Sequence, residues 1–263
     1  MKAKKILFNA LKIIGVIAFW VAVWCLVSFR VNSELLFPSP TSVIKALGEL
    51  AVTAEFWQTA CTSLLRIVAG IIISLIIGTL LAVITEHSKI LNALLSPVLA
   101  VVKSTPVASF IILALLWINR NSLPLFITAL IVIPIVWSNV SEGIRSVDKS
   151  LIEVSRVYNF TPAKKLFKLY VPSVAPFFMA ACRSSLGMAW KAGISAEVLS
   201  TPKNAIGTEL YFSKTYLETP ALFAWTLVVI VLSIIIEKLF VWGLEALARK
   251  LRVVKKGANN ADT

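Results

Sequence analysis

The sequence predicts an all-α protein that crosses a membrane several times. Of its 263 residues, 58% are hydrophobic and 15% are charged, and the mean hydropathy is +0.87. Soluble domains are usually only about 45–50% apolar. The apolar residues also gather in long runs, and a helix needs about 20 apolar residues to cross the hydrocarbon core. A polytopic membrane protein of six transmembrane helices accounts for these observations.

Six apolar runs qualify or nearly qualify as spanning helices, and they cover residues 6–29, 64–84, 91–117, 123–140, 174–199 and 222–247. The first run follows Lys2, Lys4 and Lys5, as a signal peptide would, but it exceeds the usual apolar core of about 7–15 residues. No small-residue cleavage site follows it, so we expect a retained membrane anchor.

The segments between and around the runs set the expected organisation of the chain. Residues 1–38 form the N-terminal cytoplasmic segment with the first span, and residues 39–55 form an amphipathic external segment. There, Ser39-Pro40-Thr41 opens a stretch with Val43 and Leu47 apolar at helical spacing, which predicts a surface helix. A transmembrane core follows over 56–252, with a cytoplasmic insert at 148–170, and a polar cytoplasmic tail over 253–263.

The net charge of +13 is explained by membrane topology. Most lysines and arginines lie in the N-terminus, the 85–90 loop, the 141–171 loop and the tail, which all fall on one side if there are six spans. Cytoplasmic loops carry such an excess, so both termini and the insert are predicted to be cytoplasmic. Binding to nucleic acid would instead require a basic soluble face, and none is expected.

Small residues and prolines mark the expected packing of the spans. Gly70, Ser74 and Gly78 recur every four residues, which lines one helix face and allows another helix to approach closely. That face serves either packing within the chain or a moving or dimeric interface. Pro106 and Pro134 each remove a backbone donor inside a span, so a kink is expected at both.

The insert is predicted to form two short capped helices. Asp148 or Ser150 can cap the first helix, and Ser150 with Glu153 has the spacing of a capping box. Arg156 lies within pairing distance of Glu153. Asn159 stands where the first helix is expected to stop, because asparagine tolerates the left-handed conformation of such stops.

A second helix of the insert is expected to begin with Thr161 as its cap and Pro162 in its first turn. It carries Lys164 and Lys165, and Pro172 is expected to end it. These caps are compatible both with a docking element and with a loop that is merely well folded.

The insert resembles the EAA signature of binding-protein-dependent ABC importer permeases, which begins Glu-Ala-Ala-x3-Gly. Here the segment from Glu153 reads Glu-Val-Ser-Arg-Val-Tyr-Asn, so Ser155 replaces an alanine and Asn159 the glycine, and Pro172 matches the signature proline. The segments 37–43, 63–70, 145–148, 196–199 and 219–223 are similar to the nitrate, sulfonate and taurine branch of these permeases.

This resemblance implies the fold of a type I importer permease in a bacterial plasma (inner) membrane. It also implies two ATPase subunits, a second permease copy and an external solute-binding protein as partners. ATP and Mg would bind to the ATPases, because no Walker phosphate loop occurs in this sequence, and the chain itself would bind no cofactor. The helix from Ser150 to Tyr158 would be the coupling helix, and the residues expected to take part are Ser150, Glu153, Arg156, Asn159, Thr161, Lys164 and Lys165.

Charged residues inside spans are candidates for the translocation path. Lys103 and Arg183 are predicted to lie near the midplane, at roughly 18 Å and 14 Å along their helices at about 1.5 Å per residue. They would favour an anionic solute. The alternative is that Lys103 bonds carbonyls loosened by Pro106 and that Arg183 pairs with a helix end or an acidic residue.

Five further charged residues lie in the predicted spans. Lys191 and Glu197 are expected to pair with each other or to line an outer gate of the path. Arg66 is expected to snorkel outward, and Glu237, with the lysine that follows it, to be interfacial or internally paired.

Two other classes of protein fit the sequence less well. An ion-coupled carrier would need paired acidic or histidine groups in the spans and usually an internal repeat, and neither is found. A membrane-embedded enzyme would need a catalytic or metal-binding cluster, but His87 is the only histidine and Cys25, Cys61 and Cys182 lack metal-ligand spacing. A transport subunit with no catalytic residue and no metal site is therefore predicted.

Overall fold

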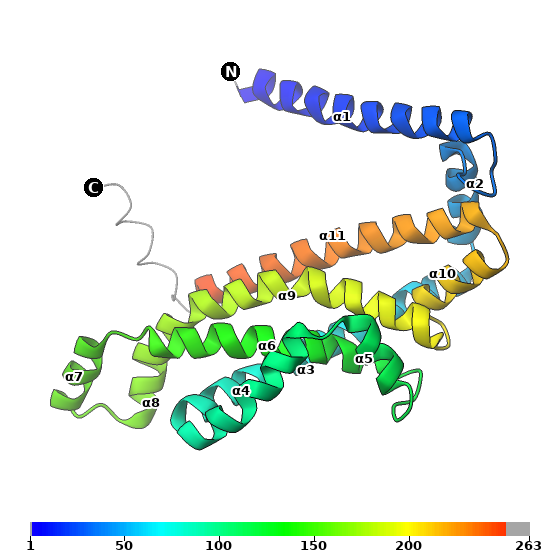
Figure 1. The fold of residues 1–263 in the computed structure, drawn as a ribbon. Coiled ribbons are helices and arrows are strands. Elements are labelled where there is room, and N and C mark those ends of the chain that lie inside the picture. Colours follow the sequence, from blue (N-terminus) through cyan, green and yellow to red (C-terminus); the bar gives the residue numbers. More distant parts are fainter. Residues whose placement is uncertain (1, 251–263) are drawn as a thin grey trace.

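The protein is described over residues 2–250 by a computed structural model and consists, in this part, of helices joined by short loops (Figure 1). The predicted tail at 253–263 lies outside these residues. The long helices are α1 (Lys2–Val31), α3 (Ala54–His87), α6 (Leu123–Arg145), α9 (Val171–Ser200) and α11 (Thr219–Lys250). The short ones are α2 (Pro40–Ala51), α4 (Lys89–Ser104), α5 (Val107–Ala114), α7 (Lys149–Val157), α8 (Pro162–Lys165) and α10 (Ile206–Thr215). A π-helical turn, η1 (Leu166–Tyr170), joins α8 to α9.

Helices occupy all six predicted spans, but they differ in length and in how apolar they are. Within residues 2–250, α1, α3, α6 and α11 are long and apolar enough to cross a membrane, and the bent pair of α4 and α5 would make a fifth span. Helix α9 has 30 residues, about 45 Å of helix, and so exceeds the bilayer core of about 30 Å. Its charged residues, Arg183, Lys191 and Glu197, lower its apolarity.

The predicted span at 91–117 is not one continuous helix, because the chain breaks at Pro106. The axes of α4 and α5 differ by 106°, far more than a kink. Thr105 adopts extended backbone angles and ends α4, as expected for a residue whose helical conformation would clash with a following proline ring. Helix α6, by contrast, continues as one helix through Pro134.

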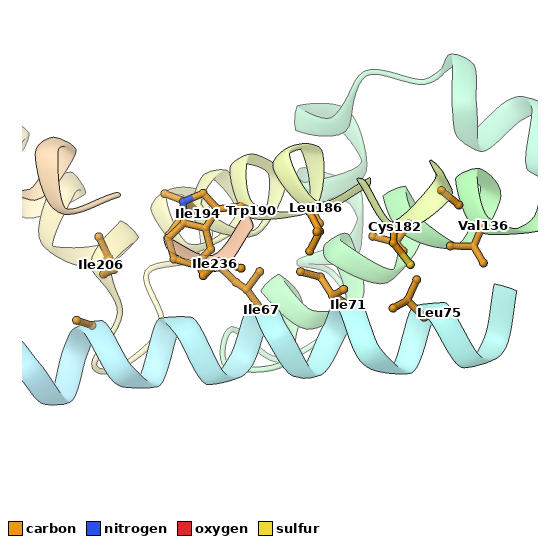
Figure 2. Close-up of a cluster of buried hydrophobic side chains, with 14 of the residues drawn as sticks. Ile67, Ile71, Leu75, Val136, Cys182, Leu186, Trp190, Ile194, Ile206 and Ile236 are labelled. Atoms are coloured by element: carbon orange, nitrogen blue, oxygen red, sulfur yellow. The ribbon is translucent and has the colours of Figure 1, made fainter. Parts of the chain in front are cut away.

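The core lies where α3, α6 and α9 meet, with α11 packed over them. Figure 2 shows Ile71 of α3 facing Leu186 of α9 among other buried apolar side chains. Trp190 of α9 is also buried, and its indole N–H donates to the carbonyl of Val229 on α11 at 3.1 Å. This bond satisfies the polar atom of a large apolar side chain and ties α11 to the core.

The small residues of α3 face α6 within this chain. A Cβ added to Gly78 would lie 2.8 Å from the Cβ of Val136, and one added to Gly70 would lie 3.1 Å from Thr128. Ser74 is buried between them, and its hydroxyl donates to the carbonyl of Gly70. Of the two interpretations left open by the sequence, the structure therefore corresponds to packing within the chain.

Helix α1 stands apart from the other long helices over most of its length (Figure 1) and contacts α2 and, through Trp24 against Phe223, the start of α11. The surface helix expected after residue 39 is present as α2, with the Ser39 hydroxyl accepting from the amide of Ser42 at 3.2 Å. The apolar side chain of Val43 is buried, and α2 packs against α11. None of the apolar window 14–31 of α1 is buried inside the chain.

Candidate functional site

Two regions bring together the residues that the sequence singled out. One is the α7–α8 insert at one end of the bundle, and the other is a face of α9 within the bundle.

At the opposite end of α9 from the insert, a buried ion pair joins Arg66 of α3 to Glu197, with Nη1 and Oε1 2.8 Å apart. The side chain of Glu197 is 0% exposed and that of Arg66 is 13% exposed. Two predictions are thereby corrected, because Arg66 does not snorkel outward and Glu197 pairs with it and not with Lys191.

The second carboxylate oxygen of Glu197 holds α10 in place. Its Oε2 accepts from the hydroxyl of Ser63 at 2.8 Å and from the amide of Gly207 at 3.1 Å. The Ser63 hydroxyl in turn accepts from the amide of Ile206 at 2.8 Å. These two amides open α10, so the carboxylate satisfies helix donors that lack intrahelical partners. Since Glu197 is buried in this network, it does not line a path, contrary to expectation.

The backbone at Gly207 lies against α9 so closely that no side chain fits. An added Cβ would lie 2.3 Å from the Cβ of Glu197 and 2.5 Å from the amide nitrogen of Val198. The sequence interpretation missed both α10 and this network. The available signal was a pair of opposite charges, Arg66 and Glu197, each placed within an apolar run, where unpaired charges are costly.

At the other end of the bundle, the first helix of the insert is capped by Asp148. Its carboxylate accepts from the amide and the hydroxyl of Ser150, at 2.9 Å and 2.6 Å. These bonds hold the pKa of Asp148 below its usual value, so the cap is charged at neutral pH. The capping box of Ser150 and Glu153 is not formed, because the helix already begins at Lys149.

The turn between the two insert helices follows the prediction. Asn159 has a φ of 48°, in the left-handed region that glycine favours and asparagine tolerates. The Thr161 hydroxyl then accepts from the amide of Lys164 at 3.3 Å and caps α8. The Lys164 ammonium lies 4.1 Å from the ring centroid of Phe160.

Pro172 does not end the second helix of the insert, contrary to prediction. Helix α8, η1 and α9 follow one another without a loop from Pro162 to Ser200. The amide of Val171 bonds to the carbonyl of Leu166, one residue further back than in an α-helix. This wider turn accommodates Pro172, whose ring would crowd the carbonyl four residues earlier.

Helix α7 exposes an apolar surface that the sequence interpretation did not identify. In this helix only Ser155 is buried. The exposed apolar side chains on α7 and at its C-cap are Leu151, Val154, Val157 and Tyr158, and we call them the α7 apolar patch. Val157 is 78% exposed and Tyr158 is 72% exposed. The signal available in the sequence was their spacing of three, three and one, which groups residues on a helix surface.

The base of the insert is fixed to the membrane helices by a bidentate ion pair. Arg145, the last residue of α6, donates to Glu86 near the end of α3, with Nη2 2.7 Å from Oε1 and Nε 3.0 Å from Oε2. Such fork geometry restrains orientation better than a single contact does. The insert therefore begins from a fixed point.

The predicted path cations lie on two helices, α4 and α9. Arg183 and Lys191 are on exposed positions of α9, about 12 Å apart along the axis at about 1.5 Å per residue. Lys103 is exposed at the end of α4, where its ammonium lies 5.9 Å from the ring centroid of Trp137. The sequence prediction that these residues form a solute path remains a prediction.

The fold defines the class of protein. The chain resembles the solved structure entitled "Crystal structure of an amino acid ABC transporter with histidines", with a TM-score of 0.53 and 17% identity over 73% of this chain and 90% of that one. At this identity the likeness concerns the fold alone, which is that of a type I ABC importer permease.

The family follows from the sequence. Residues 42–253 match the model of the family described as "Binding-protein-dependent transport system inner membrane component". Because this match covers most of the chain, the chain belongs to this family. The resemblance predicted from the EAA-like segment is thereby confirmed, and the chain is a multi-pass inner-membrane permease.

Several curated proteins are similar to the chain. The putative aliphatic sulfonates transport permease protein of Bacillus subtilis (strain 168) is 25% identical over 88% of this chain and 83% of its own length. The corresponding putative permease of Escherichia coli (strain K12) is 29% identical over 76% of each chain. The bicarbonate transport system permease protein of Synechococcus elongatus is 30% identical, over 58% of this chain and 55% of its own length.

Proposed function

We propose that this chain is the permease subunit of an ATP-driven importer and that it forms the path of a small anionic solute. Two ATPase subunits would dock on the insert, a second copy of the chain would complete the path, and an external binding protein would deliver the solute. ATP and Mg would be held by the ATPases. Both termini would be cytoplasmic, on the same side as the insert.

The observation that carries the proposal is the α7 apolar patch. An exposed group of apolar side chains, rimmed by polar residues and raised on a short capped helix, is typical of a protein interaction site. Aqueous exposure of Val157 and Tyr158 costs free energy that a partner groove would recover at about 25 cal/mol per Å² of apolar area buried. The charged residues Glu153 and Arg156 would then form the rim of the contact and set its register.

The insert is mechanically suited to coupling. The Glu86–Arg145 pair fixes its start, and its second helix continues into α9 without a loop. Displacement of α7 by ATPase closure would thus reach a membrane helix directly. Such a rigid-body displacement can bias a two-state equilibrium between inward-open and outward-open forms.

Docking is tested by Val157→Asp on the affinity-tagged chain purified from native membranes. We expect loss of the co-purifying ATP hydrolysis, because a carboxylate would have to be desolvated in the contact. The matched control is Val52→Asp, since Val52 is 85% exposed at the end of α2, away from the insert. Undiminished ATPase recovery with Val157→Asp would contradict the docking site, and uptake without any nucleotide hydrolysis would favour an ion-coupled carrier.

An anionic solute is supported by the cations on exposed positions of the bundle. Arg183 and Lys191 share one side of α9, and Lys103 ends α4 at the break. Two copies of the chain would double these charges around a shared path. The names of the curated relatives agree, because alkyl sulfonates and bicarbonate are both anions.

The solute class is tested by uptake into vesicles that hold the complete importer. We expect a sulfonate to enter and Lys103→Met combined with Arg183→Met to reduce its uptake at least tenfold with ATPase recovery unchanged. Lys45→Met, on the exposed face of α2, is the control and should leave uptake unaltered. Unchanged uptake by the double variant, or transport of neutral and cationic solutes alone, would refute the anionic path.

The orientation of the insert is tested with Ser150→Cys in a chain whose native cysteines, Cys25, Cys61 and Cys182, are replaced by alanine. An impermeant thiol reagent should label this position only after the membrane is opened from the cytoplasmic side. Labelling of intact cells would place the insert outside and refute the proposed topology.

A further inference from the structure

A lipid-sized pocket lies beside the insert, at the cytoplasmic end of the bundle under the proposed topology. Its volume is about 630 Å³, within the range of small-molecule sites of about 300–1,000 Å³. Helices α3, α6, α9 and α11 form its walls, and α8 with η1 forms its outer edge. The walls are apolar, and they include Val83, Val140, Val174, Phe178 and Leu244.

The charges at the pocket have one sign. Among its lining residues, all of which the structure describes, Lys165 and His87 are the only ones that can carry a positive charge, and none is acidic. His87 donates from Nδ1 to the carbonyl of Val83 at 2.8 Å, so its Nε2 remains for another partner. Lys164 and Lys168 add positive charge on the same short segment of α8 and η1.

The pocket lies on the side of α9 opposite Lys191 and next to Arg183. Ala175 lines the pocket, and the sixteen residues from it to Lys191, at about 3.6 per turn, place the two roughly 160° apart around the helix. Met179 also lines the pocket, and Arg183 follows it by four residues, about 40° around the helix. The pocket therefore adjoins one of the proposed path cations and lies away from the other.

On α3 the pocket is continuous with a surface suited to lipid. Ile76 and Leu80 are each 56% exposed and lie one or two turns from Val83, toward the middle of the helix. On α11, Trp242 is exposed two residues before Leu244, and tryptophan is enriched at the level of lipid head groups. An acyl chain that enters the pocket could thus run on along α3.

We propose that this pocket binds an anionic phospholipid of the cytoplasmic leaflet. Its acyl chain would lie against Val83, Val174 and Phe178, and its phosphate would meet Lys165 and His87. Anionic head groups are attracted by such basic pockets between membrane helices on the cytoplasmic side. The lipid would fill the space beneath the insert and brace α8, which continues into α9. This proposal does not depend on the identity of the solute.

The proposal is tested by native mass spectrometry of the purified full-length chain exchanged into phosphatidylglycerol or phosphatidylcholine. We expect one phosphatidylglycerol per chain to survive mild delipidation and phosphatidylcholine to be lost. Lys165→Gln should weaken retention about fivefold, since one basic residue near an anionic surface contributes about 1 kcal/mol. Lys89→Gln, a cytoplasmic lysine outside the pocket, is the charge control and should retain the lipid.

The contribution of the apolar pocket to lipid binding is tested separately from that of Lys165. Ala175→Phe should fill the pocket and abolish retention although Lys165 is intact, whereas Val98→Phe on the exposed face of α4 should have no effect. A photo-reactive amino acid at position 83 should form an adduct with lipid. An adduct with protein, from a second copy or an ATPase, would overturn the proposal, as would equal retention of both lipids or full retention by Ala175→Phe.

Discussion

Substitution of Glu197 is expected to destabilise the protein more than most single changes would. In Glu197→Ala, the guanidinium of Arg66, the hydroxyl of Ser63 and the amide of Gly207 lose their shared acceptor. The carboxylate is fully buried and the guanidinium is 13% exposed, so water replaces these bonds poorly. Breaking a buried pair by removing one partner costs about 3–5 kcal/mol.

The free energy of unfolding can be measured by reversible titration of detergent-solubilised protein with dodecyl sulfate. Glu197→Gln keeps the shape and one acceptor oxygen, so its cost should be smaller than that of Glu197→Ala. A double variant, Arg66→Leu with Glu197→Leu, removes both charges and should lie nearer the wild type than Glu197→Ala does, because paired replacement by apolar residues is often neutral.

Two results would refute this reasoning about the Arg66–Glu197 pair. One is a loss below about 1 kcal/mol for Glu197→Ala, a value typical of exposed ion pairs. The other is additivity of the two single leucine variants in the double variant, because residues that share a network should show a coupling energy of about 0.5–3 kcal/mol.

Three further changes test helix packing and the insert. Gly78→Ala places a Cβ 2.8 Å from that of Val136 and should cost about 1–3 kcal/mol of unfolding free energy in the same titration. Gly187→Ala, whose added Cβ would have nothing within 4 Å, is the control and should cost far less. Equal costs for the two variants would contradict close packing of α3 against α6. Asn159→Val should strain the left-handed turn by about 1–3 kcal/mol and lower the recovery of ATPase with the tagged chain. Asn159→Gly should keep that recovery, because glycine adopts the left-handed conformation readily. Equal recovery from both variants would show that this conformation is not needed for docking. Arg145→Lys removes the bidentate geometry but keeps the charge. It should lower the free energy of unfolding by under about 1 kcal/mol in the same titration, because the side chain is 55% exposed. A larger loss would show that the ion pair anchors the insert more strongly.

Sequence patterns located the membrane helices because burial in lipid demands about 20 consecutive apolar residues. Helix α9 was found although it carries three charged residues, because most of its other residues are apolar. The break at Pro106 was expected only as a kink, because a proline fixes the local backbone but does not say how far the next helix turns. That turn is set by packing of α5 against α9 and α6.

The insert was predictable from local chemistry, and the buried network was not. The Asn159 turn and the Thr161 cap depend on neighbours within a few residues, which a sequence displays directly. The Arg66–Glu197 pair joins residues 131 positions apart, and helix α10 lacks the apolar periodicity that marks a helix. Arg66 was therefore expected to snorkel outward, and Glu197 was expected either to pair with Lys191 or to line an outer gate.

The run from α8 through η1 to α9 has no loop between the insert and the far end of the bundle. Helix α9 has 30 residues and extends about 45 Å at about 1.5 Å per residue. An α-helix resists stretching and compression, so a displacement at the insert end of α9 must tilt or slide the whole helix. Since Glu197 bonds the other end of α9 to α3 and α10, the point about which α9 turns lies at the end far from the insert.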